Sequence, residues 1–179
     1  MDKESLYNSY MKTDIMLRLS RKELEELGQL SSDCYSENFH EGIENWLSKA
    51  FIWPSLSIYA KEDELIGYVI SFPYNSKKEV VLKAKIKEIP ENVDCIYIHD
   101  IGVKKSYRGQ GIAKKLLQIV FQEAKHHIRC KKFFLTSVQN TVKFWEKFGF
   151  KIVSVTEYGG EKAFKMERPI EEKVPKKNI

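Results

Sequence analysis

The sequence predicts a single-domain α/β (α+β) fold in which helices pack against a mixed central sheet. Three observations predict it: runs with period-2 alternation, segments with helical spacing, and the order in which they follow one another. The chain has 179 residues, enough for one domain with its own core, and 42% of them are hydrophobic. We expect residues 1–170 to form that domain and residues 171–179 to fray as a tail.

The first half of the chain is expected to hold an extended segment, two helices and a hairpin, over residues 11–19, 20–33, 40–50, 57–61 and 65–72. Ser20 followed three residues later by Glu23 is typical of a capping box, which fixes the start of the first helix. Glu62-Asp63-Glu64 supplies the hairpin turn. The lysine-rich residues 73–92 are interpreted as an irregular surface insertion.

The second half is expected to continue with strand, helix, strand, helix and a final hairpin, which gives the order β-α-α-β-β-β-α-β-α-β-β. Residues 93–103 are apolar on both faces, as in a central strand. Alternation places two sets of side chains on opposite faces of this strand. One face carries Cys95, Tyr97, His99 and Ile101, and the other carries Ile96, Ile98 and Asp100. A four-residue recurrence predicts the helix that follows: Ile112, Leu116, Val120, Ala124 and Ile128.

Composition excludes several function classes. The net charge of +5 is spread along the chain, whereas nucleic-acid binding normally requires a dense basic stripe. No apolar run reaches the roughly 18 residues of a membrane span, and residues 1–5 lack a signal-peptide core. Cys34, Cys95 and Cys130 form neither a disulfide framework nor a zinc pattern. We expect a cytoplasmic protein with no metal, no nucleic-acid partner and no membrane partner.

The most informative stretch is the turn from Val103 to Ala113, where the predicted strand passes into the predicted helix. The first N–H groups of a helix have no intrahelical partners, and the helix dipole adds positive charge there. A pyrophosphate suits such a site. Gly109 and Gly111 allow unusual φ values and a close approach of the backbone to phosphate oxygens.

This turn resembles the signature of the GNAT family of N-acetyltransferases, Gln/Arg-x-x-Gly-x-Gly/Ala, which matches residues 108–113. Residues 65–69 resemble the third strand of the family, and residues 140–150 resemble its last helix and the Gly-Phe turn that follows; the likeness covers roughly residues 14–168. It implies a mostly antiparallel sheet and acetyl-CoA as co-substrate. It also implies a set of cofactor-binding residues: Ile101, Gly102, Val103, Arg108, Gly109, Gln110, Gly111, Ile112, Ala113 and Asn140.

Acetyl transfer requires a base, because an alkylammonium has no free lone pair. His99 is the candidate, since histidine is unusual in an apolar strand and ordinarily titrates near neutrality; the alternative is a core histidine bonded to a backbone carbonyl. The arylalkylamine N-acetyltransferase branch has His-x-His at this strand position; His99 matches the second histidine, and Tyr97 replaces the first. Asp100 orients His99 if a bulge brings the two together, or it binds the substrate ammonium.

The leaving thiolate requires a proton, and in the family a tyrosine of the last helix commonly supplies it. This chain has Trp145 there, so Tyr158 and Tyr97 are the replacement candidates, unless no dedicated acid exists. Asn140 is expected to cap the last helix and, by resemblance, to contact coenzyme A. The missing tyrosine also leaves a second function open, a catalytically silent module that senses acyl-CoA.

The acceptor is expected to be a small-molecule amine or a peptide amine. The first two helices carry acidic and aromatic side chains that suit an arylalkylamine or a polyamine: Glu37, Phe39, Glu41, Glu44, Trp46, Phe51 and Trp53. The alternative is an amphipathic helix with a solvated acidic face. The sequence therefore predicts acetyl transfer from acetyl-CoA to a primary amine by direct attack in a ternary complex, by a monomer or homodimer.

Overall fold

A computed structural model describes residues 11–170, and over them the predicted order of strands and helices is confirmed. The strands are β1 (Lys12–Ile15), β2 (Ser57–Lys61), β3 (Leu65–Tyr74), β4 (Cys95–Val103), β5 (Lys132–Ser137), β6 (Lys151–Tyr158) and β7 (Glu161–Pro169). The helices are α2 (Arg21–Cys34), α3 (Ile43–Phe51), α4 (Ile112–Glu123) and α5 (Val142–Glu146), with short 3-10 turns between elements. The predicted C-terminal tail lies outside the described residues.

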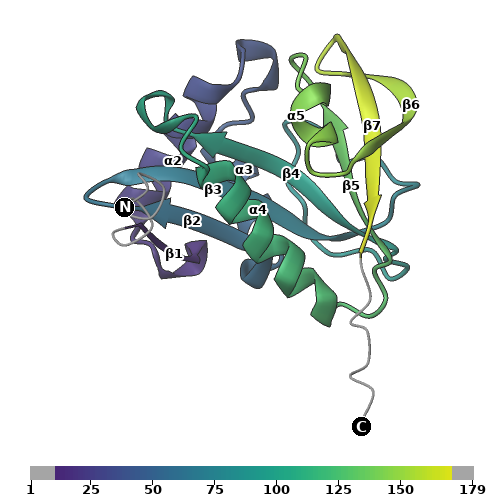
Figure 1. The fold of residues 1–179 in the computed structure, drawn as a ribbon, viewed down its shortest axis with the longest axis horizontal. Coiled ribbons are helices and arrows are strands. Elements are labelled where there is room, and N and C mark those ends of the chain that lie inside the picture. Colours follow the sequence, from purple (N-terminus) through teal and green to yellow (C-terminus); the bar gives the residue numbers. More distant parts are fainter. Residues whose placement is uncertain (1–10, 171–179) are drawn as a thin grey trace, which may run out of the picture.

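The strands form one sheet in the order β1-β2-β3-β4-β5-β7-β6 (Figure 1). All neighbours are antiparallel except β4 and β5, which run parallel. Their pairing is short: residues Cys95 to Tyr97 lie against Lys132 to Phe134. Beyond it β4 continues to Val103 and β5 to Ser137. The sheet therefore divides along the line between these two strands.

Helices cover both faces of the sheet. Helix α4 crosses the near face in Figure 1, and α2 and α3 lie behind. The α4 face holds one core cluster, with Ile96, Ile98 and Leu116 among its members. The α2/α3 face holds the other, with Trp46, Tyr68 and Tyr97. Apolar side chains on both faces of β4 explain why its sequence has no solvated side.

A β-bulge interrupts β4 at His99. The register with β3 passes from Ile98 opposite Ser71 directly to Asp100 opposite Ile70, so His99 is the extra residue. A bulge turns the following side chains to the opposite face. The predicted alternation is therefore wrong beyond His99: Asp100 joins Tyr97 on the α2/α3 face, and Ile101 packs in the α4 cluster.

Several predicted boundaries are also wrong. The segment 11–19 is extended only over β1 and then forms a 3-10 turn, Met16–Arg18. Helix α3 begins at Ile43, not His40, because Gly42 has a φ of 74°, outside the helical range. Helix α4 ends at Glu123, so Ile128 is 82% exposed. Residues 73 and 74 belong to β3.

The predicted capping box of α2 is confirmed. The Ser20 side chain accepts from the Glu23 N–H, and a Glu23 carboxylate oxygen accepts from the Ser20 N–H at 2.9 Å. The other Glu23 oxygen lies 2.7 Å from Lys61 Nζ on β2. One residue pair therefore starts the helix and ties it to the sheet.

We predict that Ser20→Ala lowers the free energy of unfolding by about 1 kcal/mol, because it leaves a helix N–H without its acceptor. The matched control is Ser32→Ala on the same helix, whose hydroxyl bonds back to the Gly28 carbonyl at 3.3 Å. That back-bond does not stabilise a helix, so the control should lose nothing. Urea unfolding of the two variants measures the difference, and equal losses would contradict the role of the cap.

Candidate active site

A cleft of about 1440 Å³ lies where β4 and β5 diverge. Seven of the predicted cofactor residues line it: Ile101, Val103, Arg108, Gly109, Gly111, Ile112 and Ala113. The three predicted catalytic residues also line it: His99, Asp100 and Tyr158. The cleft therefore runs from the glycine turn, past β4, to the side of the sheet covered by α2 and α3.

The glycine turn leads directly into α4. Gly109 and Gly111 have φ values of 80° and 81°, and a Cβ on either would meet no atom within 4 Å. The left-handed conformation, not crowding, is therefore what favours glycine at both positions. The open space over the first N–H groups of α4 suits an anion. Arg108 Nε donates to the Val103 carbonyl at 3.0 Å, which holds the turn against β4.

Three predicted cofactor residues lie differently from expectation. A Cβ at Gly102 would come within 2.8 Å of Tyr68 Cζ, so this glycine makes room for a buried ring. Gln110 donates to the Ser106 carbonyl at 3.3 Å and does not line the cleft. Asn140 is exposed with a φ of 59°, and Thr141 occupies the N-cap of α5, so the predicted cap is wrong.

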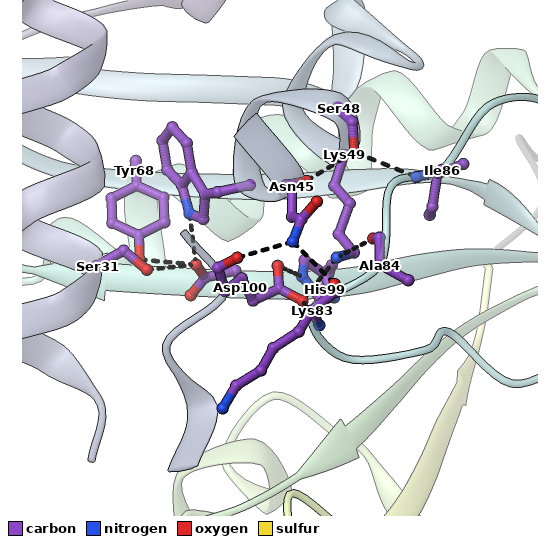
Figure 2. Close-up of polar contacts among 12 residues, drawn as sticks. Ser31, Asn45, Ser48, Lys49, Tyr68, Lys83, Ala84, Ile86, His99 and Asp100 are labelled. Carbon is purple, nitrogen blue, oxygen red and sulfur yellow. Dashed lines mark hydrogen bonds and ion pairs between the residues drawn. The ribbon is translucent and has the colours of Figure 1, made fainter. Parts of the chain in front are cut away.

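His99 is bound to a buried ion pair. Its Nε2 lies 3.0 Å from Glu41 Oε2, and Glu41 Oε1 lies 2.6 Å from the Nζ of Lys49 (Figure 2). The Lys49 side chain is fully buried and also donates to the Ala84 carbonyl at 2.9 Å. The Lys83 N–H donates to Glu41 Oε1 at 3.1 Å. Residues 83 and 84, from the segment expected to be a surface insertion, thus position the carboxylate that orients His99.

The charges around Glu41 change its titration. Burial alone would raise the pKa of its carboxyl, but the hydrogen bond and charge of His99, together with Lys49, lower that pKa to about 2. Glu41 is therefore ionised at neutral pH. In the neutral imidazole, an ionised acceptor at Nε2 favours the tautomer with hydrogen on Nε2, which leaves the Nδ1 lone pair free. Nδ1 is buried and has no hydrogen-bond partner among residues 11–170.

Asp100 does not contact His99 but holds a separate hydrogen-bond network. Its Oδ2 accepts from Ser31 Oγ, Trp46 Nε1 and Tyr68 Oη, each at 2.9 Å (Figure 2). Its Oδ1 is buried without a partner in the described part of the chain. The bulge that would let Asp100 orient His99 is present, yet Glu41 takes that role. The other expectation, that Asp100 receives an ammonium group, fits the free oxygen.

The two candidate acids differ in their surroundings. The Tyr97 hydroxyl lies 3.1 Å from Thr136 Oγ1, whereas the Tyr158 hydroxyl is buried and unpaired among the described residues. Burial raises the pKa of both phenols well above the usual range, so both stay protonated. Trp145 on α5 lines the cleft as a packing residue.

The predicted acceptor-binding set divides into two groups. Phe39, Glu41 and Trp46 line the cleft. The others do not: Glu37, Glu44, Phe51 and Trp53. Glu44 instead pairs with Arg21 and Lys85 at the surface, as the amphipathic alternative expected.

The site contains residues that sequence reasoning missed. Lys49 had the pattern of an ordinary helix lysine, and Ser31 and Tyr68 had no signal at all. Glu41 was grouped with the acidic residues of the helices, but nothing in its spacing connected it with His99, 58 positions away.

Over the described range, no helix is both long and apolar enough to cross a membrane.

Comparisons with known proteins agree with this architecture. The loading GNATL domain of CurA from Lyngbya majuscula superposes with a TM-score of 0.74 at 15% identity, over 90% of this chain and 98% of that domain. NAA60 of Arabidopsis thaliana, solved with acetyl-CoA, superposes with a TM-score of 0.68 at 18% identity, over 89% of this chain and 98% of its own. At these identities the likeness establishes the fold.

The curated sequence relatives match a shorter part of the chain. A probable spermine N(1)-acetyltransferase of Bacillus subtilis subsp. natto is 26% identical over 70 residues, which is 37% of this chain. The matched region spans about half, 46%, of that relative's length. The family model for the acetyltransferase (GNAT) family matches residues 19–150, which is most of the chain and includes β4, α4, β5 and α5. This protein therefore belongs to the GNAT family of acetyltransferases.

Proposed function

We propose that this protein transfers the acetyl group of acetyl-CoA to a primary amine by direct attack of the amine on the thioester, with both substrates bound together. The observation that carries the proposal is the arrangement of His99. Its Nε2 is bound to Glu41, while its Nδ1 is buried in the lining of the cleft without a partner among residues 11–170. A histidine oriented by a carboxylate with its second nitrogen free has the geometry of a general base.

The cofactor end of the cleft fits coenzyme A, which when bound supplies the acetyl thioester. The left-handed glycines and the first turn of α4 leave N–H groups facing open space, which suits a pyrophosphate. Lys114, in the first turn of α4, adds positive charge beside them, and Lys125 and Lys147 also line the cleft. Ile101 and Val103 line the cleft on the part of β4 beyond its pairing with β5, and they are the proposed contacts for the chain between pyrophosphate and thioester.

His99 would remove the proton that makes the amine unreactive. The amine N–H donates to Nδ1, the proton moves to the imidazole, and the Glu41 carboxylate stabilises the resulting cation. Lys49 and the Lys83 N–H hold that carboxylate in place. His99 is thus assigned as the catalytic base, and Glu41 and Lys49 are positioning residues.

The remaining requirements fall to β4 and Tyr158. Backbone N–H groups on the diverging part of β4 are suited to stabilise charge that develops on the acetyl oxygen. Tyr158, protonated and unpaired, is the proposed donor to the leaving thiolate. Asp100 is the proposed binding group for the incoming ammonium.

The comparisons support amine acetylation at the level of the family: one relative is named a spermine/spermidine N(1)-acetyltransferase, and one structural neighbour binds acetyl-CoA. The competing function is an acyl-CoA sensor, which Trp145 motivates. A free-thiol assay with acetyl-CoA and a panel of amines separates the two. Tight cofactor binding without turnover on any amine would favour the sensor.

We predict that His99→Gln lowers kcat by about 10²- to 10⁴-fold, the usual contribution of a general base, while leaving coenzyme A affinity unchanged. The pH–rate profile of kcat should also change shape, because the proposed base is removed. His127→Gln is the matched control, because His127 packs on Trp53 outside the cleft and should keep full activity. An unchanged pH profile in His99→Gln would reduce His99 to a packing residue.

We predict that the stability difference between wild type and Glu41→Gln narrows as pH falls from 4.5 to 2. The folded pKa of Glu41 is about 2, below the 4.5 of an unperturbed glutamate. A carboxyl with a lowered folded pKa stabilises the fold above its unfolded pKa and loses this contribution as pH falls through the folded value. Urea unfolding at several pH values measures the difference. A constant difference would contradict the buried ion pair.

We predict that Gly111→Asp binds coenzyme A at least about tenfold more weakly than Gly111→Asn. Both side chains tolerate the left-handed conformation similarly, so the pair isolates charge. A carboxylate about 4 Å from a phosphate costs about 1 kcal/mol in water and about 4 kcal/mol near a protein surface. Isothermal titration calorimetry measures the affinity of each variant for coenzyme A. Equal affinities would contradict the assignment of the pyrophosphate to this turn.

A further inference from the structure

Three buried polar atoms in the lining of the cleft have no hydrogen-bond partner among residues 11–170. They are His99 Nδ1, Asp100 Oδ1 and Tyr158 Oη. Each atom has less than 1 Å² of exposed surface, so protein atoms cover it. Buried polar groups are normally bonded. A ligand with N–H groups that enters the space lined by these residues would supply the partners that His99 Nδ1 and Asp100 Oδ1 lack.

The free negative charge in this space is limited to one oxygen. Among the described residues, Glu41 and Asp100 are the carboxylates that line the cleft. Both oxygens of Glu41 are occupied, Oε1 by Lys49 and Oε2 by His99. Asp100 Oδ2 already accepts three hydrogen bonds, so Oδ1 is the acceptor that remains. One such oxygen matches one ammonium group.

The rest of the cleft disfavours a second ammonium. Five cationic side chains line the cleft: Arg108, Lys114, Lys125, Lys147 and Arg168. They suit phosphate groups and repel an extended polycation. Beyond Asp100, the lining of the cleft offers a polyamine no second unpaired carboxylate among the described residues.

The walls around Asp100 Oδ1 are aromatic. Tyr35, Phe39, Trp46, Tyr97 and Tyr158 all line the cleft at this end. Aromatic rings hold an apolar body by burial and attract the ammonium beside it.

Three segments that are distant in the sequence close this space from outside. Phe39, from the turn between α2 and α3, stacks on Tyr158 with ring centroids 6.3 Å apart and planes at 15°. Beside it, Asn38 Nδ2 donates to Glu161 Oε1 at 3.3 Å. Gly159 lies so near that a Cβ there would be 2.7 Å from Phe39 Cε1 and 3.4 Å from Leu82 Cδ2. We call Phe39, Leu82 and Tyr158 the roof.

We propose that the acceptor is a compact monoamine, with a single ammonium on a short aromatic or apolar body, and not a polyamine or a polypeptide N-terminus. The inference rests on the proposed acetyl transfer and adds its selectivity. One free carboxylate oxygen receives the ammonium, the aromatic walls receive the body, and the roof excludes an acceptor whose chain continues outward.

The test compares 2-phenylethylamine, spermine and a tripeptide with a free N-terminus, first by kcat/KM with acetyl-CoA. We expect 2-phenylethylamine to exceed both others by at least about tenfold, which corresponds to about 1.4 kcal/mol. A higher kcat/KM for spermine or the tripeptide would overturn the inference. Binding of the three amines to the coenzyme A complex is measured separately by calorimetry. Selective binding of 2-phenylethylamine without turnover would support the pocket and overturn the acetyl transfer.

Two variants test the parts of the pocket. Phe39→Ala removes part of the roof, so it should raise the tripeptide-to-phenylethylamine ratio of kcat/KM by about tenfold. The control Phe51→Ala lies outside the cleft and should not change this ratio.

Asp100→Asn removes the free charge. Its kcat/KM should fall by at least about tenfold for 2-phenylethylamine, and less for an aniline derivative that is uncharged at neutral pH. Equal losses for the two amines would overturn the ammonium site.

Discussion

The candidate site depends on one extra residue in the central strand. Without the bulge at His99, the alternation of β4 would place His99 and Asp100 on opposite faces of the sheet. With it, both side chains reach the α2/α3 face, where Glu41 meets the first and Ser31, Trp46 and Tyr68 meet the second. A local irregularity of the backbone thus creates two adjacent polar groups inside an otherwise apolar wall.

Buried charge then constrains the surrounding elements. Lys49 and Glu41 are both removed from water, and an ion pair in such a place stabilises a fold only when its geometry and remaining hydrogen bonds are good. The Lys83 N–H and the Ala84 carbonyl complete those bonds. Helix α3, the long β3–β4 connection and β4 are consequently held in one arrangement, and loss of any partner would leave a charge unpaired at the centre of the site.

Sequence alone predicted what local chemistry determines. The capping box at Ser20, the element order and the glycine turn all follow from residues close together in the chain. The bulge could not be predicted from the sequence. Alternation was the signal that assigned side chains to the two faces of the strand, and a bulge interrupts alternation without a marker in the sequence. The Glu41–His99 contact was equally hidden, since no spacing rule connects a helix entry with a strand 58 positions later. Asn140 was predicted to be an N-cap because Asn favours that position. Asn also favours left-handed turns, and here Asn140 adopts the left-handed conformation.

The line where β4 leaves β5 has a consequence for the molecule as a whole. It separates a half-sheet of β1 to β4 from a half-sheet of β5 to β7, joined by strand pairing only as far as Tyr97 and Phe134. A molecule that binds in the cleft and contacts both halves adds its binding free energy to the free energy that holds the halves together. The free energy needed to separate the two half-sheets therefore includes a contribution from bound substrate, and that contribution rises with substrate concentration.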